Sequence, residues 1–188
     1  MCKSSGGTRV ITPYKGTVEQ ARERFSGMIA SGEYDVRRSY LSPSGGSLLF
    51  AKGHNIVKEE IEAGRILADK GYEVVLTPEG TADSVLKVSK RGRYKFPEGT
   101  ISLVTFEQKT PNPGKTDDAG RAQNVKKALD HGEAKSAEIV LIYDKNKALH
   151  RQDIGAGMGL FEKHSEYRFK AVVTINAKGE IHEWYHDR

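Results

Sequence analysis

Cysteine and long apolar runs are both scarce in this chain, and each absence excludes a class of protein. A single cysteine, Cys2, among 188 residues excludes an internal disulfide and a cysteine-based metal site. No apolar stretch approaches the ~20 residues that a membrane-spanning helix needs, and residues 1–7 contain no hydrophobic signal core. We therefore expect a soluble protein without a classical secretion signal of its own, in which oxygen or histidine would bind any metal.

The six histidines are scattered along the chain, and we expect no zinc site from them. His150 with Arg151, or His164, could serve as acid and base in a metal-free ribonuclease. Gly155–Gly159 is rich in glycine like a phosphate-binding loop, yet it lacks the Lys-Ser/Thr of a P-loop and follows no clear strand. We expect it to be a flexible loop that enters a short helix at Leu160–His164.

The charge balance permits a polyanionic partner without requiring one. Thirty Lys and Arg against twenty-five Asp and Glu give a net charge of +5. A local basic segment points more strongly to nucleic acid, because its cations can neutralise phosphates while aromatic rings stack on bases. The same segment could instead be a solvated hairpin with charged edges. Its residues are Lys87, Lys90, Arg91, Arg93 and Lys95, with Tyr94 and Phe96 among them.

Residues 1–50 differ from the rest of the chain. They hold a start rich in glycine and serine, an amphipathic helix expected at Thr17–Ala30, and a loose segment at 41–46. We interpret them as a linker or entry region before a main domain over residues 51–188. That domain opens with a helix between Asn55, a good N-cap, and Gly71, placed for a left-handed C-cap.

The remaining elements predict an α/β fold with a mixed central sheet flanked by helices. The nearly continuous apolar run at 137–143 is typical of a strand buried on both faces. The crossover from strand 101–108 through helix 119–131 to this strand should be right-handed. Further strands are expected at 72–78 and 84–89, and a C-terminal hairpin at 169–175 and 180–185.

Glu107 and Lys109 stand two residues apart at the end of an apolar strand, so their side chains should lie on the same face. If strands 84–89 and 101–108 pair antiparallel, Asp83 also lies near Glu107. Two carboxylates can bind Mg²⁺ or Mn²⁺, a lysine can orient the attacking water, and an acid such as Glu60 could complete the oxygen ligands. The alternatives are an ordinary surface ion pair for Glu107 and Lys109 and a turn residue for Asp83.

In combination these features resemble PD-(D/E)XK nucleases. More narrowly, they resemble the C-terminal tRNase toxin domains of contact-dependent growth inhibition proteins and of related polymorphic or phage-encoded toxins. The resemblance covers about residues 52–185. It rests on an acidic helix at 58–68, on Tyr72–Glu79, on Asp83, on Glu107-Gln108-Lys109, and on a helix bearing Gln123 before a buried strand.

The resemblance implies a role for each matching residue. Asp83 and Glu107 would bind the metal, Lys109 would be the catalytic lysine, Glu60 would be the acid of the first core helix, and Gln123 would face the site. The chain departs from the family pattern because Ala82, not proline, precedes Asp83. Two assignments stay open: Glu79 competes with Asp83 as the first acid, and Glu59 and Glu62 compete with Glu60.

The resemblance also implies a function. We expect a metal-dependent nuclease toxin domain, using Mg²⁺ or Mn²⁺, that cleaves RNA, with tRNA as the first candidate, in the cytoplasm of a target bacterium. It would be delivered as the C-terminal part of a larger secreted or phage-encoded protein and inhibited by a cognate immunity protein. The alternatives are a DNase, a metal-free RNase, and a non-catalytic module of a phage or mobile element that binds nucleic acid or protein.

Overall fold

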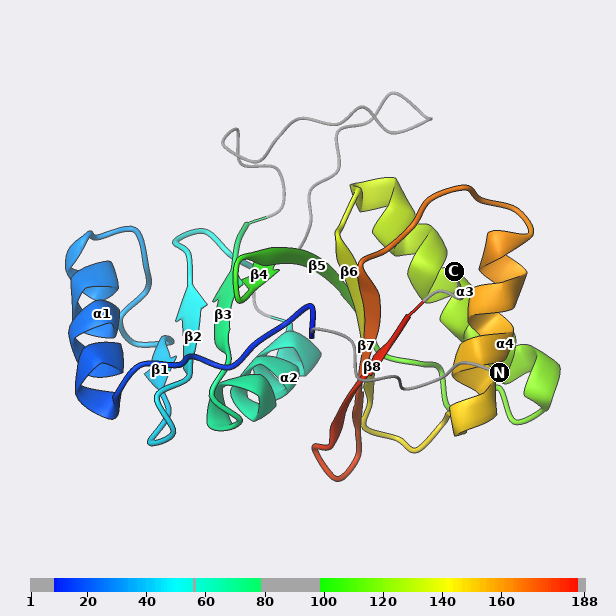
Figure 1. The fold of residues 1–188 in the computed structure, drawn as a ribbon, viewed down its shortest axis with the longest axis horizontal. Helices are drawn as coiled ribbons and strands as arrows, with labels where there is room; N and C mark the ends of the chain where they lie inside the picture. Colours follow the sequence, from blue (N-terminus) through cyan, green and yellow to red (C-terminus); the bar gives the residue numbers. More distant parts are fainter. Residues whose placement is uncertain (1–8, 56, 79–98, 186–188) are drawn as a thin grey trace. The chain divides into compact units, whose positions relative to one another are not determined.

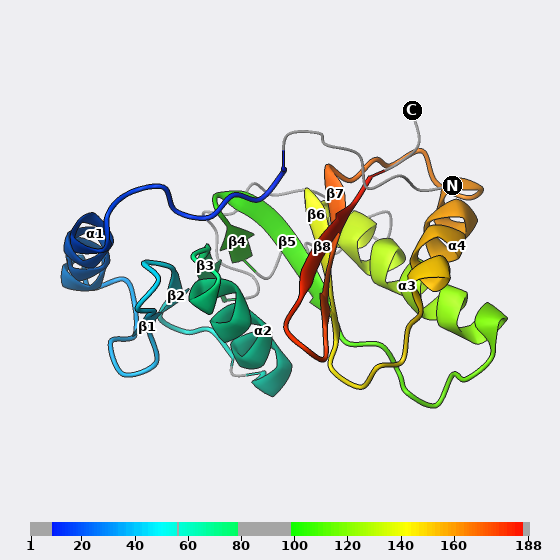
Figure 2. The same ribbon diagram turned by 60° about the horizontal axis from the view of Figure 1, so that its bottom comes forward.

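The computed structural model describes residues 9–55, 57–78 and 99–185. These residues group into two compact units, each described by itself. The N-terminal unit holds residues 11–78 and 99–105, and the C-terminal unit holds residues 9–10 and 106–185. Each unit combines strands of mixed direction with helices, as Figures 1 and 2 show, which confirms the predicted α/β class with a mixed sheet.

In the N-terminal unit the strands lie in the order β1-β2-β3-β4. β1 pairs antiparallel with β2, β2 pairs parallel with β3, and β3 pairs antiparallel with β4. Helix α2 connects the parallel pair and packs on it. The elements are α1 (Val18–Ala30), β1 (Tyr40–Leu41), β2 (Ser47–Phe50), α2 (Lys58–Asp69), β3 (Glu73–Leu76) and β4 (Gly99–Ile101).

The sequence signals at the ends of α1 and α2 are largely confirmed. Thr17 caps α1, and its hydroxyl accepts a hydrogen bond from the backbone N–H of Gln20 at 3.2 Å. α2 ends just before Gly71, whose φ of 91° is the left-handed conformation that favours glycine. The start of α2 differs from expectation, since its N-cap residue is Val57, not Asn55.

In the C-terminal unit the strands lie in the order β5-β6-β7-β8. β5, β6 and β7 are parallel, and β8 returns antiparallel beside β7 as the expected hairpin. All six residues of β6 are buried, as predicted for a central strand. The elements are β5 (Val104–Lys109), α3 (Asp118–Lys135), β6 (Ile139–Asp144), α4 (Arg151–Glu162), β7 (Ala171–Asn176) and β8 (Ile181–Trp184), and the first two residues of β5 group with the N-terminal unit.

Helices α3 and α4 pack side by side (Figure 1), and both contribute to the core of the C-terminal unit. Their close approach depends on Gly157 of α4. A Cβ atom at that position would lie 2.4 Å from the Cβ of Val125 on α3, closer than two non-bonded carbon atoms can approach. The whole segment Gly155–Gly159 lies within α4. Our prediction of a flexible loop before a short helix was wrong.

Two further expectations differ from the structure. The strand expected at 101–108 is interrupted by the turn Ser102-Leu103, and both turn residues have positive φ, 50° and 69°. We also expected an entry region before residue 51 and a main domain after it. β2, which ends at Phe50, is instead buried at all four positions and pairs with β3. The run at 48–50 follows a Ser-Pro-Ser-Gly-Gly loop, whose composition is that of a linker.

The expected strand at 84–89 lies outside the described residues. Among the residues that are described, no helix combines the length and apolar character needed to cross a membrane.

Candidate functional site

Strand β5 places Glu107 and Lys109 side by side, as the two-residue period of a strand requires. In the register with β6, Glu107 lies opposite Val140 and Lys109 lies opposite Ile142. Both partners belong to the buried core cluster that α3 and α4 help to form. Paired residues of parallel strands project to the same side of a sheet. Glu107 and Lys109 therefore point to the face on which α3 packs.

The carboxylate of Glu107 is completely buried and is enclosed by two ammonium groups. Its Oε1 lies 2.7 Å from Nζ of Lys109, and its Oε2 lies 2.8 Å from Nζ of Lys135. Within the described part of the chain, neither oxygen accepts a hydrogen bond of regular angular geometry. The two contacts are thus ion pairs by distance rather than aligned hydrogen bonds. We call these three residues the Lys-Glu-Lys cluster.

Lys135 is the member of the cluster that our sequence analysis missed. It is the last residue of α3, and its side chain is only 12% exposed. The signal was present in the sequence, because Lys135 follows Ala128 and Gly132 by seven and three residues and so continues the buried face of the helix. The predicted helix ended at residue 131, four positions too early to include it.

In the cluster, one buried carboxylate contacts two ammonium groups. A buried carboxylate is very costly unless it is paired, and here each oxygen has its own cation. Lys109 is the most accessible member, with 33% of its side chain exposed. The arrangement can bind an anion through the lysines or, if one lysine moves aside, a hard cation through Glu107.

Glu60 lies in the N-terminal unit, on the first turn of α2, and it contacts His54. Nε2 of His54 lies 3.0 Å from Oε2 of Glu60, and both side chains are more than nine-tenths buried. Nδ1 of His54 lies 3.0 Å from the backbone oxygen of Thr77. Of the three acids that the sequence left open on this helix, Glu60 is the buried one, and Glu59 and Glu62 are partly exposed.

The two contacts of His54 fix where its protons must be. A carbonyl oxygen only accepts, so Nδ1 carries a proton and donates to Thr77. An ionised carboxylate also only accepts, so a hydrogen bond to Glu60 requires a further proton on Nε2 or on the carboxyl group.

The other predicted site residues are not brought to this cluster by the described structure. Gln123 is exposed on α3, twelve residues before Lys135, which is about 18 Å along a helix axis. Its role in nucleic-acid binding stays a prediction. Several positions lie outside the described residues: Glu79, Ala82, Asp83 and the basic segment Lys87, Lys90, Arg91, Arg93 and Lys95.

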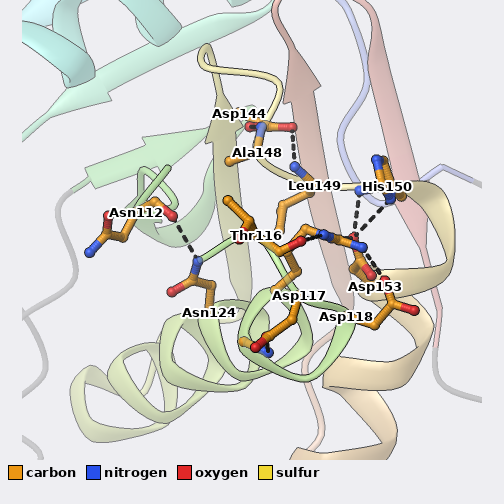
Figure 3. Close-up of polar contacts among 12 residues, drawn as sticks. Asn112, Thr116, Asp117, Asp118, Asn124, Asp144, Ala148, Leu149, His150 and Asp153 are labelled. Atoms are coloured by element: carbon orange, nitrogen blue, oxygen red, sulfur yellow. Dashed lines mark hydrogen bonds and ion pairs between the residues drawn. The ribbon is translucent and has the colours of Figure 1, made fainter. Parts of the chain in front are cut away.

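A second polar group joins the starts of α3 and α4, and Figure 3 shows it in close-up. Nε of Arg121 donates to Oδ2 of the buried Asp153 at 2.8 Å, and the backbone N–H of His150 donates to the same oxygen at 2.6 Å. Arg121 also donates to the Thr116 carbonyl and pairs with Asp118. Oxygen or nitrogen atoms of Asp118, His150 and Asp153 lie within 4.8 Å of one another, as in a metal site. The guanidinium of Arg121, however, already provides the cation between the two acids.

The sequence matches no protein-family model and no curated protein. One solved structure is similar in fold. It is a CdiA-CT/CdiI toxin and immunity complex from Burkholderia pseudomallei, with a TM-score of 0.47 and 18% sequence identity over 71% of this chain and 96% of that chain. A likeness of this size assigns neither an activity nor a residue.

Proposed function

We propose that the chain is a metal-dependent endonuclease toxin domain that hydrolyses phosphodiester bonds in RNA, with tRNA as the first candidate substrate. The observation that carries the proposal is the buried Glu107 carboxylate in contact with Lys109 at 2.7 Å. An acid and a lysine on one face of a strand are the pair that the resemblance to PD-(D/E)XK nucleases requires. A carboxylate and a lysine suit hydrolysis of a phosphodiester, in which negative charge increases toward the transition state.

The donor set fits a divalent metal. Both oxygens of Glu107 are buried, and neither accepts a regular hydrogen bond within the described residues. Carboxylate oxygens are the ligands that Mg²⁺ and Mn²⁺ prefer. We propose Glu107 as one ligand and Asp83, from the sequence, as the second. When bound, the metal would lower the pKa of a coordinated water and so supply the nucleophile.

The chain's own residues then have separate tasks. Lys109, the most exposed member of the Lys-Glu-Lys cluster, orients the attacking water and stabilises the charge that develops on the phosphate. Glu107 fixes the position of Lys109 through their ion pair. Residues of the basic segment between Lys87 and Lys95 bind the nucleic-acid backbone, as their composition indicates.

A metal-free ribonuclease is the second candidate, and one observation favours it. Glu107 already has an ammonium group at each oxygen. The two ammonium groups could therefore bind a phosphate directly, with Glu107 holding the two lysines in place. Cleavage that persists in excess EDTA distinguishes this candidate from the metal-dependent one.

The biological setting follows from the resemblance. We propose that the chain acts in the cytoplasm of a target bacterium after delivery as the C-terminal part of a larger protein. A cognate immunity protein would cover the site and protect the producing cell. An acidic immunity protein would complement the net charge of +5.

The experiment is a cleavage assay on total RNA, purified tRNA and plasmid DNA, each with Mg²⁺, Mn²⁺ or EDTA. We expect metal-dependent cleavage of RNA by the wild type and loss of cleavage in Glu107→Gln and Lys109→Met, with circular dichroism showing that both variants fold. Lys126→Met is the matched control, because Lys126 pairs with Asp130 on α3 and not with Glu107. Absence of cleavage under every condition would contradict the proposal.

The same variants separate a nuclease from a non-catalytic binding module. Expression of the chain in a bacterium should stop growth, and Glu107→Gln and Lys109→Met should relieve that toxicity without loss of folded protein. A binding module would keep both its affinity for nucleic acid and its effect on growth after either substitution.

A further inference from the structure

We propose that Arg151, held over the ring of Trp184, is a contact for nucleic acid, and that its guanidinium binds a backbone phosphate of the RNA substrate. This inference rests on the nuclease function proposed above. It deepens that function by adding a second place, outside the Lys-Glu-Lys cluster, at which the chain binds its substrate. The residues that carry the inference all belong to the C-terminal unit.

The contact between Arg151 and Trp184 is the first argument. Cζ of Arg151 lies 5.5 Å from the centroid of the Trp184 ring, within the range of a cation–π contact. The ring itself is fixed, because its Nε1 donates to Oγ1 of Thr174 at 3.0 Å and its side chain packs against the core cluster. Trp184 is thus a positioning residue that holds one face of the guanidinium.

The hydrogen-bond donors of Arg151 are the second argument. Arg151 is the first residue of α4 and is exposed, and within the described part of the chain it forms no hydrogen bond and no ion pair. The buried Asp153 of the same helix already accepts from Arg121 and from the backbone of His150. A guanidinium has five N–H donors in a planar fork. With one face on the indole, its edges can still bind a phosphate through paired hydrogen bonds.

The segment before α4 is fixed by hydrogen bonds, as Figure 3 shows. Asp144, the buried last residue of β6, accepts from the backbone N–H groups of Ala148 at 2.7 Å and Leu149 at 3.0 Å. The backbone N–H of His150 donates to Asp153 at 2.6 Å. The start of α4 is therefore ordered before any ligand arrives, which lowers the entropy cost of binding.

The local charge favours a chain of phosphates as the ligand. Residues 145–151 contain four basic side chains and no acidic one, namely Lys145, Lys147, His150 and Arg151. Lys147 and His150 are exposed, as Arg151 is. A nucleic-acid backbone can meet several of these cations at once, and each phosphate that they neutralise releases counterions. A partner protein with an acidic surface is the other possible occupant, and the experiment distinguishes the two.

The test uses Trp184 as a probe, since it is the only tryptophan in the sequence. The protein is titrated with purified tRNA in EDTA, and a gel checks that the tRNA stays intact. Trp184 fluorescence reports contact at this surface, and the anisotropy of labelled tRNA gives the affinity at several salt concentrations. We expect tRNA to change the fluorescence of the wild type. Arg151→Gln should weaken binding about tenfold and lower the slope of log affinity against log salt by about one.

Three further variants separate the guanidinium from its charge. Lys163→Gln is the matched control, because the exposed Lys163 caps the other end of α4, and it should bind as the wild type does. Arg151→Lys keeps the charge but not the planar fork, so it should keep the salt slope and lose part of the affinity. Trp184→Leu should weaken binding about two- to fivefold at an unchanged salt slope, because Arg151 is no longer held in place.

Two outcomes would overturn the inference, with circular dichroism showing that each variant folds. The first is unchanged Trp184 fluorescence with tRNA together with equal affinities of wild type and Arg151→Gln, which would assign the surface to a protein partner instead. The second is an equal loss in Lys163→Gln, since the effect would then come from net charge alone. Failure of the nuclease proposal is recognised separately, as absence of cleavage in the RNA and DNA assays.

Discussion

Nε2 of His54 and Oε2 of Glu60 lie 3.0 Å apart, with Nδ1 of the same ring on the backbone oxygen of Thr77. This buried pair connects the loop before α2 to the first turn of that helix. A buried donor or acceptor that loses its partner keeps its full cost of desolvation. The pair therefore offers a stability test that does not depend on catalysis.

Substitutions of Glu60 should show how much its hydrogen bond with His54 contributes to the stability of the fold. We expect Glu60→Ala to lower the free energy of unfolding by about 1–3 kcal/mol, because the buried hydrogen bond between His54 and Glu60 is lost. Glu60→Gln should cost less, since a carboxamide N–H can donate to the neutral ring. Urea unfolding at neutral pH measures both, with Glu62→Ala as a surface control. Equal losses in the two Glu60 variants would show that the hydrogen bond contributes little.

The Lys-Glu-Lys cluster should behave as a coupled unit. We expect Glu107→Gln to lower the free energy of unfolding by about 3–5 kcal/mol, because it removes the buried charge that pairs with both Lys109 and Lys135. Lys135→Met should cost less, since Lys109 still faces the carboxylate. The double variant with Glu107→Gln and Lys135→Met should lose less free energy of unfolding than the sum of the two single losses. Urea unfolding of the wild type, the two single variants and the double variant measures this. Strictly additive losses would mean that the residues do not interact.

Two glycines of α4 form a matched pair. A Cβ at Gly157 would meet Val125 at 2.4 Å, whereas no atom of the described residues lies within 4 Å of a Cβ at Gly159. We expect Gly159→Ala to stabilise the protein by about 0.5–1 kcal/mol through helix propensity. Gly157→Ala should destabilise it by about 1–3 kcal/mol, because α3 and α4 are forced apart. Thermal unfolding compares the two, and stabilisation by both would mean that the helices do not pack as closely as described.

A glycine in the turn between β4 and β5 should stabilise the protein. Leu103 has a φ of 69°, and its side chain is exposed, with a relative accessibility of 76%. We expect Leu103→Gly to stabilise the protein by about 1 kcal/mol, because the left-handed conformation is costly for residues with a Cβ. Leu103→Ala is the control, since it removes the apolar side chain but keeps the Cβ. Chemical unfolding compares the two variants. If both raise the free energy of unfolding equally, the gain comes from removal of the exposed apolar side chain and not from the backbone conformation.

Tyr185 should contribute a pH-dependent part of the stability. Its hydroxyl donates to Oε2 of Glu183 at 2.5 Å. Burial, this hydrogen bond and the charge of Glu183 raise the pKa of Tyr185 from 10.0 to about 12. Because the folded pKa exceeds the unfolded one, the contribution is complete below pH 10 and is lost as the pH rises to about 12.

The comparison of wild type with Tyr185→Phe measures this contribution. The difference in their free energies of unfolding should be constant below pH 10 and should shrink above it, in parallel with the tyrosinate absorbance. A difference that stays constant through pH 12 would contradict the assigned pKa.

Strong periodicity made several elements predictable from the sequence. β6 was recognised because a short, nearly continuous apolar run such as 137–143 is typical of a strand buried on both faces. The side-by-side placement of Glu107 and Lys109 followed from the two-residue period of β5 and is confirmed by their 2.7 Å contact. Their catalytic and metal-binding roles stay predictions.

The elements that the sequence analysis missed depend on tertiary contacts. Gly155–Gly159 resembles a loop by composition, and only the close packing against Val125 explains glycine within a helix there. Ser102-Leu103 lacks the Asn or Gly residues that usually identify a turn with two positive φ values. Lys135 was missed because the predicted helix ended at residue 131, and its contact with Glu107 is visible only in the fold.

The burial of Glu107 determines which charge of the Lys-Glu-Lys cluster is accessible from solution. The acid has no exposed surface, while Lys109 keeps a third of its side chain accessible. An approaching polyanion therefore encounters a cation here, although the site is organised around a carboxylate. Attraction of this kind weakens as salt is added. Capture of a nucleic acid should accordingly be sensitive to ionic strength, whereas the contact between Lys135 and Glu107, shielded inside the fold, should not.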